Sequence, residues 1–591
     1  MSDHLTDHQT EPTDVTDATD ATGATGATGA TADGDGRRVV VIGGGIGGLA
    51  AAALLARGGA QVTLLERHER LGGRFGTLEI DGFRFDTGPS WYFMPEVFAH
   101  FFALFGEDIA DHLDLERLDP AYRVFYEPTP GQPAQTLDVG ADAEANWARF
   151  DALEPGAGER IREYAANATD AYRMAVDHFL YTTFARPDKV LSADILRRTP
   201  ELVRLLSETL ADRVARTVQD PRLRQVLSYH AVFLGSSPYR VPGLYTLMSH
   251  LDLVDGVRFP RGGMYTIIQA IERLAVEAGV EIRTGCEVTS IEVDPARRTA
   301  RAPRRTGVAR GVRLATGEVV AADVVVSGAD LHHTETVLLD PAHCNLPEKS
   351  WEQRGPGISS LLIMLGVRGE LPELPHHSLF FTRDWPGNFE SLLGRGTTSP
   401  VEDLQVPQEG SIYVSRTSAT DADAAPAGHE NLFILVPFPA DPSLGAGTDG
   451  RAALEAHADR FIDQVGSWAG VPDLRARVVT RRVYGPSDFA EDFSAWRGTA
   501  LGMEHTLRQS ALFRPGNVSP RVPNLLYVGG GTIPGVGLPM CLISAELVAK
   551  RLLGETSSRA LPTPLRPGFL DASRAPDVWP AAAAGRARDV P

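Results

Sequence analysis

The stretch VVVIGGGIGGLAAAALLAR, from Val39 to Arg57, decides the fold of this chain. The β-branched run at its start, Val39 to Ile42, predicts a buried strand, and the Ala- and Leu-rich run from Leu49 to Ala56 predicts a helix. The glycines between them predict a tight turn. Because a strand precedes the spacing Gly-x-Gly-x-x-Gly and a helix follows it, the stretch is typical of a dinucleotide-binding fold.

Each fingerprint glycine has a physical role. Gly43 permits the tight turn, Gly45 lets a pyrophosphate approach the backbone, and Gly48 lets the helix pack on the strand. Free amides at the helix start then face the phosphates. Glu66 ends a second predicted strand, residues 61–66, where its carboxylate can accept hydrogen bonds from ribose hydroxyls and would repel the extra phosphate of NADP. The fingerprint alone leaves FAD and NAD open.

The same stretch could be mistaken for a membrane span. Residues 39–56 carry no charge, and Arg37, Arg38 and Arg57 flank them. The clustered glycines favour the strand, turn and helix instead, and a polar, acidic segment precedes the arginine pair. We therefore expect neither a transmembrane segment nor a signal peptide.

Composition excludes some partners. The chain has 591 residues, 43% hydrophobic and 23% charged, which predicts two packed domains with ample core material. Its formal net charge is −19; the first 36 residues contribute eight acidic side chains and no Lys or Arg, which leaves about −11 for the rest. This balance argues against nucleic acid as a partner. Peripheral binding to a membrane stays open, because a small apolar or basic patch is enough for it.

Three cysteines without a CxxC pattern indicate a reducing compartment. We expect a cytoplasmic protein that associates peripherally with the inner face of the cell membrane. The paired histidines, His332-His333 and His376-His377, lack the spacing of a helical metal site, so we expect no metal.

Further elements follow along the chain. Residues 90–254 are expected to be mostly helical. A second α/β stretch at 260–328 holds a helix at 264–278, a strand at 281–291, a hairpin through 316–318 and a strand at 323–327. Strand-like runs occupy 358–440, a helix follows near 452–469, and a last strand at 524–528 leads into a helix near 540–553.

Three segments favour FAD over NAD, because of the family that they resemble. Gly72-Gly73-Arg74 follows Glu66, and FPRGGM at 259–264 precedes the helix and the strand through Val288. NLLYVGGGTIPGVGLPMCLISAELVAKRL closes the pattern at 524–552. These segments resemble a flavoprotein superfamily that includes amine oxidases and carotenoid desaturases. The closing motif is most similar to the bacterial and fungal phytoene desaturases. Two further segments share this similarity: GPSWYFMPEVFAHFFALFG (88–106) and YHAVFLGSSPYRVPGLYTLMSHL (229–251).

The resemblance implies an α/β fold in which a Rossmann-like FAD-binding domain is interleaved with a mixed α+β substrate domain. The first would take residues 37–120, 255–340 and 490–556, and the second, facing the substrate and the membrane, 121–254 and 341–489. Residues 1–36 and 557–591 are expected to be disordered tails. Contact with FAD is implied for Gly43, Gly45, Ile46, Gly47, Gly48, Glu66, Arg67, Gly73, Arg74, Val288, Gly531, Gly537 and Met540. Many relatives carry a histidine where this chain has Ile533.

The resemblance also implies a reaction: desaturation of a long apolar isoprenoid, most directly phytoene, toward neurosporene- or lycopene-type carotenes. FAD would accept the hydride, and oxygen or a quinone would reoxidise it. The catalytic residue is unknown from sequence; Asp86 and Arg240 are candidates for the proton acceptor, with structural roles as the alternative. Aromatic side chains either line a substrate tunnel or form ordinary core. They are Trp91, Tyr92, Phe93, Phe98, Phe101, Phe102, Phe105, Phe233, Tyr239 and Tyr245.

Three alternatives stay open at this point. The chain could be another carotenoid-modifying flavin enzyme, such as a later desaturase, an isomerase or a ketolase. It could be an amine oxidase, which would need a polar or acidic substrate pocket. It could also be an isoprenoid-binding protein without catalysis, which need not keep the flavin contacts.

Overall fold

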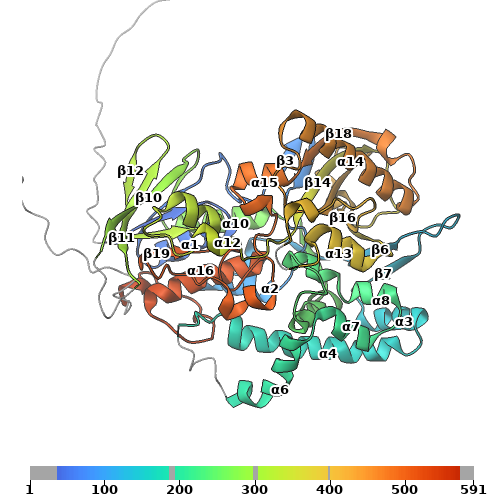
Figure 1. The fold of residues 1–591 in the computed structure, drawn as a ribbon, viewed down its shortest axis with the longest axis horizontal. Helices are drawn as coiled ribbons and strands as arrows, with labels where there is room; N and C mark the ends of the chain where they lie inside the picture. The colour runs from blue at the N-terminus through green and yellow to red at the C-terminus, as the bar shows by residue number, and fades with distance from the viewer. Residues whose placement is uncertain (1–35, 186–192, 297–303, 397–398, 573–591) are drawn as a thin grey trace, which may run out of the picture. The chain divides into compact units, whose positions relative to one another are not determined.

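The computed structural model describes residues 36–185, 193–296, 304–396 and 399–572 (Figure 1). The predicted first tail, residues 1–36, lies outside the described residues except for Gly36. Within the described ranges, we find no helix that combines the length and apolarity needed to cross a bilayer.

A parallel five-stranded sheet carries the glycine fingerprint. Its strands, in spatial order, are β19 (Leu525–Tyr527), β13 (Val324–Ser327), β1 (Arg38–Ile42), β2 (Gln61–Leu65) and β9 (Glu281–Arg283). These strands come from the beginning, middle and end of the chain. The expected Rossmann-like arrangement is therefore present, with segments far apart in sequence side by side.

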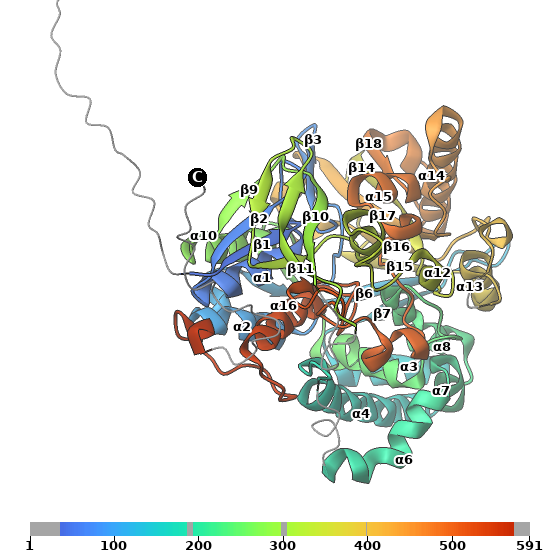
Figure 2. The same ribbon diagram turned by 60° about the vertical axis from the view of Figure 1, so that its left-hand side comes forward.

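Alternate side chains of β1 face two different layers. Val39 and Val41 pack into the cluster that contains three helices: α1 (Ile46–Arg57), α10 (Thr266–Glu277) and α16 (Leu538–Leu553). Val40 and Ile42 pack on the other side, against an antiparallel sheet of β10 (Val288–Pro295), β11 (Gly307–Leu314) and β12 (Val319–Ala321). Because neighbouring residues of a strand point to opposite faces, the run VVVI must be apolar throughout. Figure 2 shows α1 and α16 on one side of β1 and β2, with β10 and β11 on the other.

A seven-stranded sheet forms the second large element. Its order is β18 (Val478–Tyr484), β14 (Ser359–Arg368), β17 (His429–Phe438), β16 (Ile412–Ser415), β15 (His377–Phe381), β6 (Tyr122–Tyr126) and β7 (Thr136–Val139). Leu361 and Ile363 of β14 pack on the long helix α14 (Gly447–Ala469). Leu362 and Met364 face the opposite way, into the main core. Alternation along the strands thus leaves one face of this sheet free to line a cavity.

Helices gather beside this sheet, as Figure 1 shows. They are α3 (Ala143–Leu153), α4 (Ala157–Ala175), α6 (Ala193–Ser207), α7 (Leu210–Thr217), α8 (Pro221–Val226), the short turns η3 (Tyr229–Leu234), η4 (Gly243–Leu247) and α9 (Met248–His250), and the π-helices η2 (Val176–Leu180) and η5 (Leu251–Asp255). Helix α2 (Pro95–Phe105) lies beside α16 instead. The region predicted to be mostly helical also holds β5 (Leu115–Arg117), β6 and β7. β6 forms a strand because its aromatic and β-branched side chains pair in parallel with β15, more than 250 residues away.

The prediction of one continuous strand at residues 281–291 is wrong. Residues 281–291 divide into β9, which joins the parallel sheet, and β10, which begins the antiparallel sheet. Gly285 between them has φ +63°, a backbone conformation that ends a strand. The hairpin through Gly317 is confirmed, since β11 and β12 are antiparallel neighbours.

The predicted second tail begins too early. Residues 557–572 are ordered and pack on the helices that cover the parallel sheet: Leu561, Leu565, Phe569 and Leu570 are all buried. The backbone N–H of Leu570 donates to the carbonyl of Gly58 at the end of α1. The segment is rich in Pro and Arg, and this composition led to the prediction of disorder. The prediction is wrong for these residues, because four apolar side chains in the segment are buried. Residues 573–591 lie outside the described residues.

Weakening the packing of this C-terminal segment should destabilise the fold. The substitution Leu570→Ala removes a side chain that is 3% exposed and should lower the free energy of unfolding by about 2–5 kcal/mol, the usual cost of a buried cavity. Leu512→Ala, at a leucine that is 61% exposed, is the matched control and should change it by less than about 0.5 kcal/mol. Denaturant unfolding of both variants provides the measurement; equal effects would contradict the packing described.

Candidate cofactor and substrate cavity

One cavity of about 590 Å³ brings together the three glycine-bearing segments. Residues 43–48, 72–74 and 529–541 all contribute to its wall, except Gly44 and Ile533. Each residue for which FAD contact was predicted lines this cavity: Gly43, Gly45, Ile46, Gly47, Gly48, Glu66, Arg67, Gly73, Arg74, Val288, Gly531, Gly537 and Met540. Their contact with the cofactor itself stays a prediction, but their convergence is a property of the fold.

The turn between β1 and α1 shows why glycines stand there. Gly43 has φ +89°, and a Cβ on Gly48 would lie 2.0 Å from the carbonyl oxygen of Gly43. These two glycines are therefore required by the protein's own packing. Gly45 differs: its φ is −64°, and a Cβ there would meet one atom within 4 Å, at 3.9 Å. The space in front of Gly45 is open cavity, so the lack of a side chain at this position leaves room for a ligand.

Two helix N-termini begin at this cavity. No side chain caps α1 at Gly45 or α16 at Gly537, so their first amides stay available for a ligand. The backbones of the two segments also touch: a Cβ on Gly47 would lie 3.0 Å from the Cα of Gly529. The positive ends of both helices thus lie on the same cavity, an arrangement that favours phosphate and other negative charge.

Glu66 braces the fingerprint turn. Its Oε2 accepts a hydrogen bond from the N–H of Gly44 at 2.7 Å, and its Oε1 accepts one from the N–H of His68 at 2.9 Å. The side chain is buried and lines the cavity. Its remaining lone pairs can still serve a ribose, so the predicted role and this structural role are compatible.

The Gly72-Gly73-Arg74 segment is fixed to the first turn by backbone contacts. Gly72 donates its N–H to the carbonyl of Gly44 at 2.9 Å, and both glycines have positive φ. The Arg74 guanidinium lies 3.4 Å from a carboxylate oxygen of Asp330, while its Nε has no hydrogen-bond partner although it is buried. Because an unpartnered buried donor is costly, Arg74 is suited to an oxygen of a ligand in the cavity. Arg67 instead donates to the Glu491 carbonyl and to Ser494 Oγ.

These residues fit the FAD predicted from the sequence. Gly45 and Gly529 leave space that no protein atom fills, two uncapped helix starts offer amides, and Arg74 holds an unused donor. A dinucleotide with a pyrophosphate and a planar ring needs each of these features.

Aromatic and aliphatic side chains form the rest of the cavity wall. We call this part the apolar arm; it is lined by Trp91, Phe93, Met94, Tyr229, Val232, Phe233, Leu234, Tyr245, Leu251, Leu362, Leu379, Phe381, Trp385, Tyr413 and Phe433. Helical turns η3 to η5 supply one side and the free face of the seven-stranded sheet supplies the other. The arm can therefore bind a long apolar molecule and keep water away from it.

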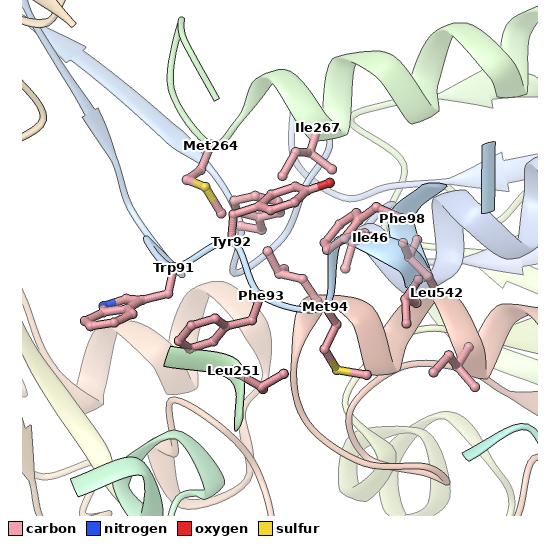
Figure 3. Packing of buried hydrophobic residues seen from close by; sticks show 14 of the residues in the cluster. Ile46, Trp91, Tyr92, Phe93, Met94, Phe98, Leu251, Met264, Ile267 and Leu542 are labelled. Carbon is pink, nitrogen blue, oxygen red and sulfur yellow. The ribbon is translucent and has the colours of Figure 1, made fainter. Parts of the chain in front are cut away.

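The aromatic residues predicted near residue 90 divide into two groups. Figure 3 shows Phe93 beside Leu251 and Trp91 directed away from both, whereas Tyr92 points toward Met264 and Ile267. Trp91 and Phe93 line the cavity, as do Phe233 and Tyr245. The others are outside its wall: Tyr92, Phe98, Phe101, Phe102 and Phe105 are core, and Tyr239 is 43% exposed. Helical spacing could not separate the two groups, because α2 starts after residue 94 and the preceding residues are not helical.

Neither sequence candidate for the proton acceptor faces the cavity. Asp86 accepts hydrogen bonds from the N–H groups of Met264 and Tyr265 at 2.9 and 3.1 Å, and burial raises its pKa to about 6. Arg240 is paired with Glu504 and donates to the carbonyls of residues 393 and 394. Both are structural, the alternative that the sequence left open.

The paired histidines have hydrogen-bond partners of their own. His377 Nδ1 lies 2.8 Å from the hydroxyl of Tyr413, and its ring stacks on Trp91. His376 Nδ1 lies 2.7 Å from the hydroxyl of Thr420. In the described part of the chain, no group of three or more His, Cys, Asp or Glu side chains is placed to hold a metal ion.

Sequence reasoning missed His505. This histidine is 3% exposed and lines the cavity, where its Nε2 lies beside Gly535. The surrounding sequence GMEHTL carries no motif, and residue 505 lies outside the closing motif. Its position results from tertiary packing, so no local signal could have identified it.

Comparison with known proteins agrees with the cofactor and the family predicted from the sequence. The profile of the family described as flavin containing amine oxidoreductase matches residues 46–553. A carotenoid 3,4-desaturase from Haloarcula japonica is 38% identical over 88% of this chain and 99% of its own length. A zeta-carotene-forming phytoene desaturase from Myxococcus xanthus is also 38% identical, over 88% of this chain and 95% of its own length.

Solved structures with low sequence identity share the fold. An oxidoreductase from Methanosarcina mazei superposes with a TM-score of 0.53 at 16% identity, covering 87% of this chain and all of its own. Putrescine oxidase bound to putrescine gives a TM-score of 0.54 at 15% identity, covering 88% of this chain and 99% of its own. At these identities the similarity concerns the fold alone.

We call the glycine-bearing part of the cavity wall, formed by the cavity-lining residues of 43–48, 72–74 and 529–541, the cofactor cradle. Gly45 offers a direct test of it. The substitution Gly45→Val fills the open space without backbone strain, so the protein should fold but bind FAD more weakly by at least about tenfold, a loss of roughly 1.4 kcal/mol. Flavin absorbance of the purified variant, and its unfolding transition compared with flavin-stripped wild type, give the two readouts. A variant with the wild-type flavin content would contradict the proposed cradle.

Proposed function

The chain belongs to the flavin containing amine oxidoreductase family and to its carotenoid desaturases, and from this premise we propose that it desaturates phytoene toward neurosporene- or lycopene-type carotenes. The observation that supports this proposal is the continuity of the glycine-lined cradle with the apolar arm in one cavity. A cofactor held in the cradle and a hydrocarbon held in the arm would therefore meet.

FAD, the cofactor of this family, would supply the two-electron acceptor for a hydride from a C–H bond beside a double bond. The residues of the chain supply the conditions for that transfer. The apolar arm binds the hydrocarbon through burial, at roughly 0.8 kcal/mol per CH₂, and excludes water from the reacting carbons. The faces of Trp91, Phe93 and Phe233 can stabilise positive charge that develops on the polyene.

The charge distribution in the cavity disfavours an amine substrate. The carboxylates in the cavity wall are Glu66, Glu287, Asp330 and Asp492, and none of them comes from the turns η3 to η5 or the strands β14 to β17 that form the apolar arm. Glu66 and Asp330 contact the fingerprint turn and Arg74. The wall of the arm, within the described residues, carries no acidic side chain that could hold an ammonium group.

A second candidate is a later desaturation on an already conjugated carotenoid. The carotenoid 3,4-desaturase from Haloarcula japonica favours it, because its identity of 38% equals that of the phytoene desaturase from Myxococcus xanthus. The apolar arm would accept both substrates, since a hydrocarbon tunnel distinguishes poorly between similar polyenes.

We further propose that the protein works at the inner face of the cell membrane, where its water-insoluble substrate is dissolved. Support comes from three exposed apolar side chains on two adjacent short turns: Leu507 of η12 (Leu507–Gln509), and Leu512 and Phe513 of η13 (Ala511–Phe513). Such a group can insert into the interface of a bilayer. Oxygen or a membrane quinone would reoxidise the flavin there.

Anaerobic mixing tests the proposed reaction. The purified yellow protein should lose its flavin absorbance when phytoene in detergent micelles is added, and the product should absorb at longer wavelength. Putrescine at the same concentration should leave the flavin oxidised. If lycopene reduces the flavin and phytoene does not, the second candidate is correct; if no polyene reduces it while an amine does, desaturation is excluded.

Sedimentation with liposomes tests membrane binding. Leu512→Asp combined with Phe513→Asp should reduce the fraction bound at least about fivefold, because the exposed apolar area that enters the interface is replaced by charge. Val203→Asp, at an equally exposed apolar residue on α6, provides the comparison and should bind like wild type. Unchanged binding of the double variant would reject these turns as the docking site.

A further inference from the structure

His505 stands where the cradle and the apolar arm meet. Its Nδ1 lies 3.0 Å from the carbonyl oxygen of Leu234, at the end of η3. Its ring is edge-on to Tyr245 of η4, with the centroids 6.2 Å apart. Leu234 and Tyr245 line the apolar arm, whereas the loop on the other side of the ring, residues 534–537, belongs to the cradle. The imidazole therefore lies at the junction of the two parts of the cavity.

The hydrogen bonds fix which ring nitrogen is free. A carbonyl oxygen can only accept, so Nδ1 carries the proton and donates it to Leu234. Nε2 is then left with its lone pair. The nearest donor, the N–H of Val536, is 3.4 Å away, which is long for a hydrogen bond.

Gly535 lets the ring come this close. Its φ is +146°, and a Cβ there would lie 2.6 Å from Nε2 of His505. Any other residue at this position would collide with the imidazole. The closing motif and His505 are thus fitted to one another, although thirty residues separate them in the sequence.

Among the other acid–base groups in the cavity wall, Glu66, Asp330 and Asp492 are already engaged. Glu66 accepts from two backbone N–H groups, and Asp330 accepts from the N–H of His332 and pairs with Arg74. Asp492 accepts from the hydroxyl of Tyr484. Nε2 of His505, by contrast, has a lone pair with one weak partner and lies at the junction with the apolar arm.

We propose that Nε2 of His505 accepts the proton released in the desaturation, an inference that rests on the proposed function. Two C–H bonds on adjacent carbons break: one hydrogen leaves with its electron pair to bound FAD, the other leaves as a proton to Nε2. The electrons of the second C–H bond form the new C=C bond. The imidazolium later returns the proton to solvent.

The surroundings of His505 keep it ready for this role. Burial, reinforced by the positive charge of Arg514, lowers the pKa of His505 well below its usual range, so the ring is neutral before reaction. The facing groups are Tyr245 and Arg514, while the carboxylate of neighbouring Glu504 turns away to Arg240 and Ser236. A weak base is sufficient, because the C–H bond beside a developing allylic cation is strongly acidic.

The substitution His505→Asn separates proton transfer from structure. An asparagine amide can still donate to the Leu234 carbonyl but offers no basic nitrogen. His457→Asn is the control, since His457 is a half-buried histidine on α14 that packs on Phe438 away from the cavity. Both variants are assayed as flavin-loaded proteins by anaerobic mixing with phytoene. The isotope effect is measured with phytoene carrying deuterium at each carbon of the new double bond.

We expect H505N to keep wild-type flavin content and phytoene affinity within about threefold, and to reduce the flavin at least about 100-fold more slowly. Deuterium at the carbon that loses the proton should give a larger isotope effect in H505N than in wild type, because proton removal becomes limiting. H457N should match wild type throughout.

Two results would overturn the inference. One is a flavin reduction rate in H505N within threefold of wild type; the other is a slow rate with unchanged isotope effects, which would make His505 a structural residue. Absence of flavin reduction by phytoene in wild type would reject the proposed function itself, and the comparison between wild type and H505N distinguishes that failure from the failure of His505.

Discussion

Backbone contact between glycines is the constraint on which this structure depends. Gly47 at the start of α1 touches Gly529 after β19, and Gly48 touches Gly43 across the first turn. A side chain at Gly48 would push α1 away from β1, and one at Gly47 would separate the first and last segments of the parallel sheet. The cavity exists because these backbones approach so closely, and both helix N-termini point at it for the same reason.

The second large sheet makes that cavity useful for a hydrocarbon. Strands β14 to β17 bury one face under α14 and turn the other face to the cavity, so the wall opposite the cradle is apolar by strand alternation. The helical turns η3 to η5 close the remaining side. A cofactor cradle built from backbone and an apolar arm built from side chains thus meet at His505, where polar chemistry is available in an otherwise apolar space.

Short-range patterns predicted the fingerprint turn well, because its glycines, its strand and its helix lie within a few residues of one another. The contact residues in the other two glycine-bearing segments and at Val288 were predicted from the family resemblance. All the predicted contact residues line the cavity, and the family resemblance is confirmed. Longer-range features could not be read from the sequence. The division of residues 281–291 between two sheets depends on their separate partners, and the order of residues 557–572 depends on α1. His505 becomes distinctive when Leu234 and Gly535 are brought to either side of it, and neither is near it in the chain.

A crystal structure of the purified, flavin-loaded protein tests the central claim most directly. The account predicts one FAD whose pyrophosphate lies against residues 43–48 and whose ring lies between residues 529–540 and the apolar arm, within reach of His505. An FAD bound elsewhere, or an isoalloxazine ring shut off from the arm by protein, would contradict it.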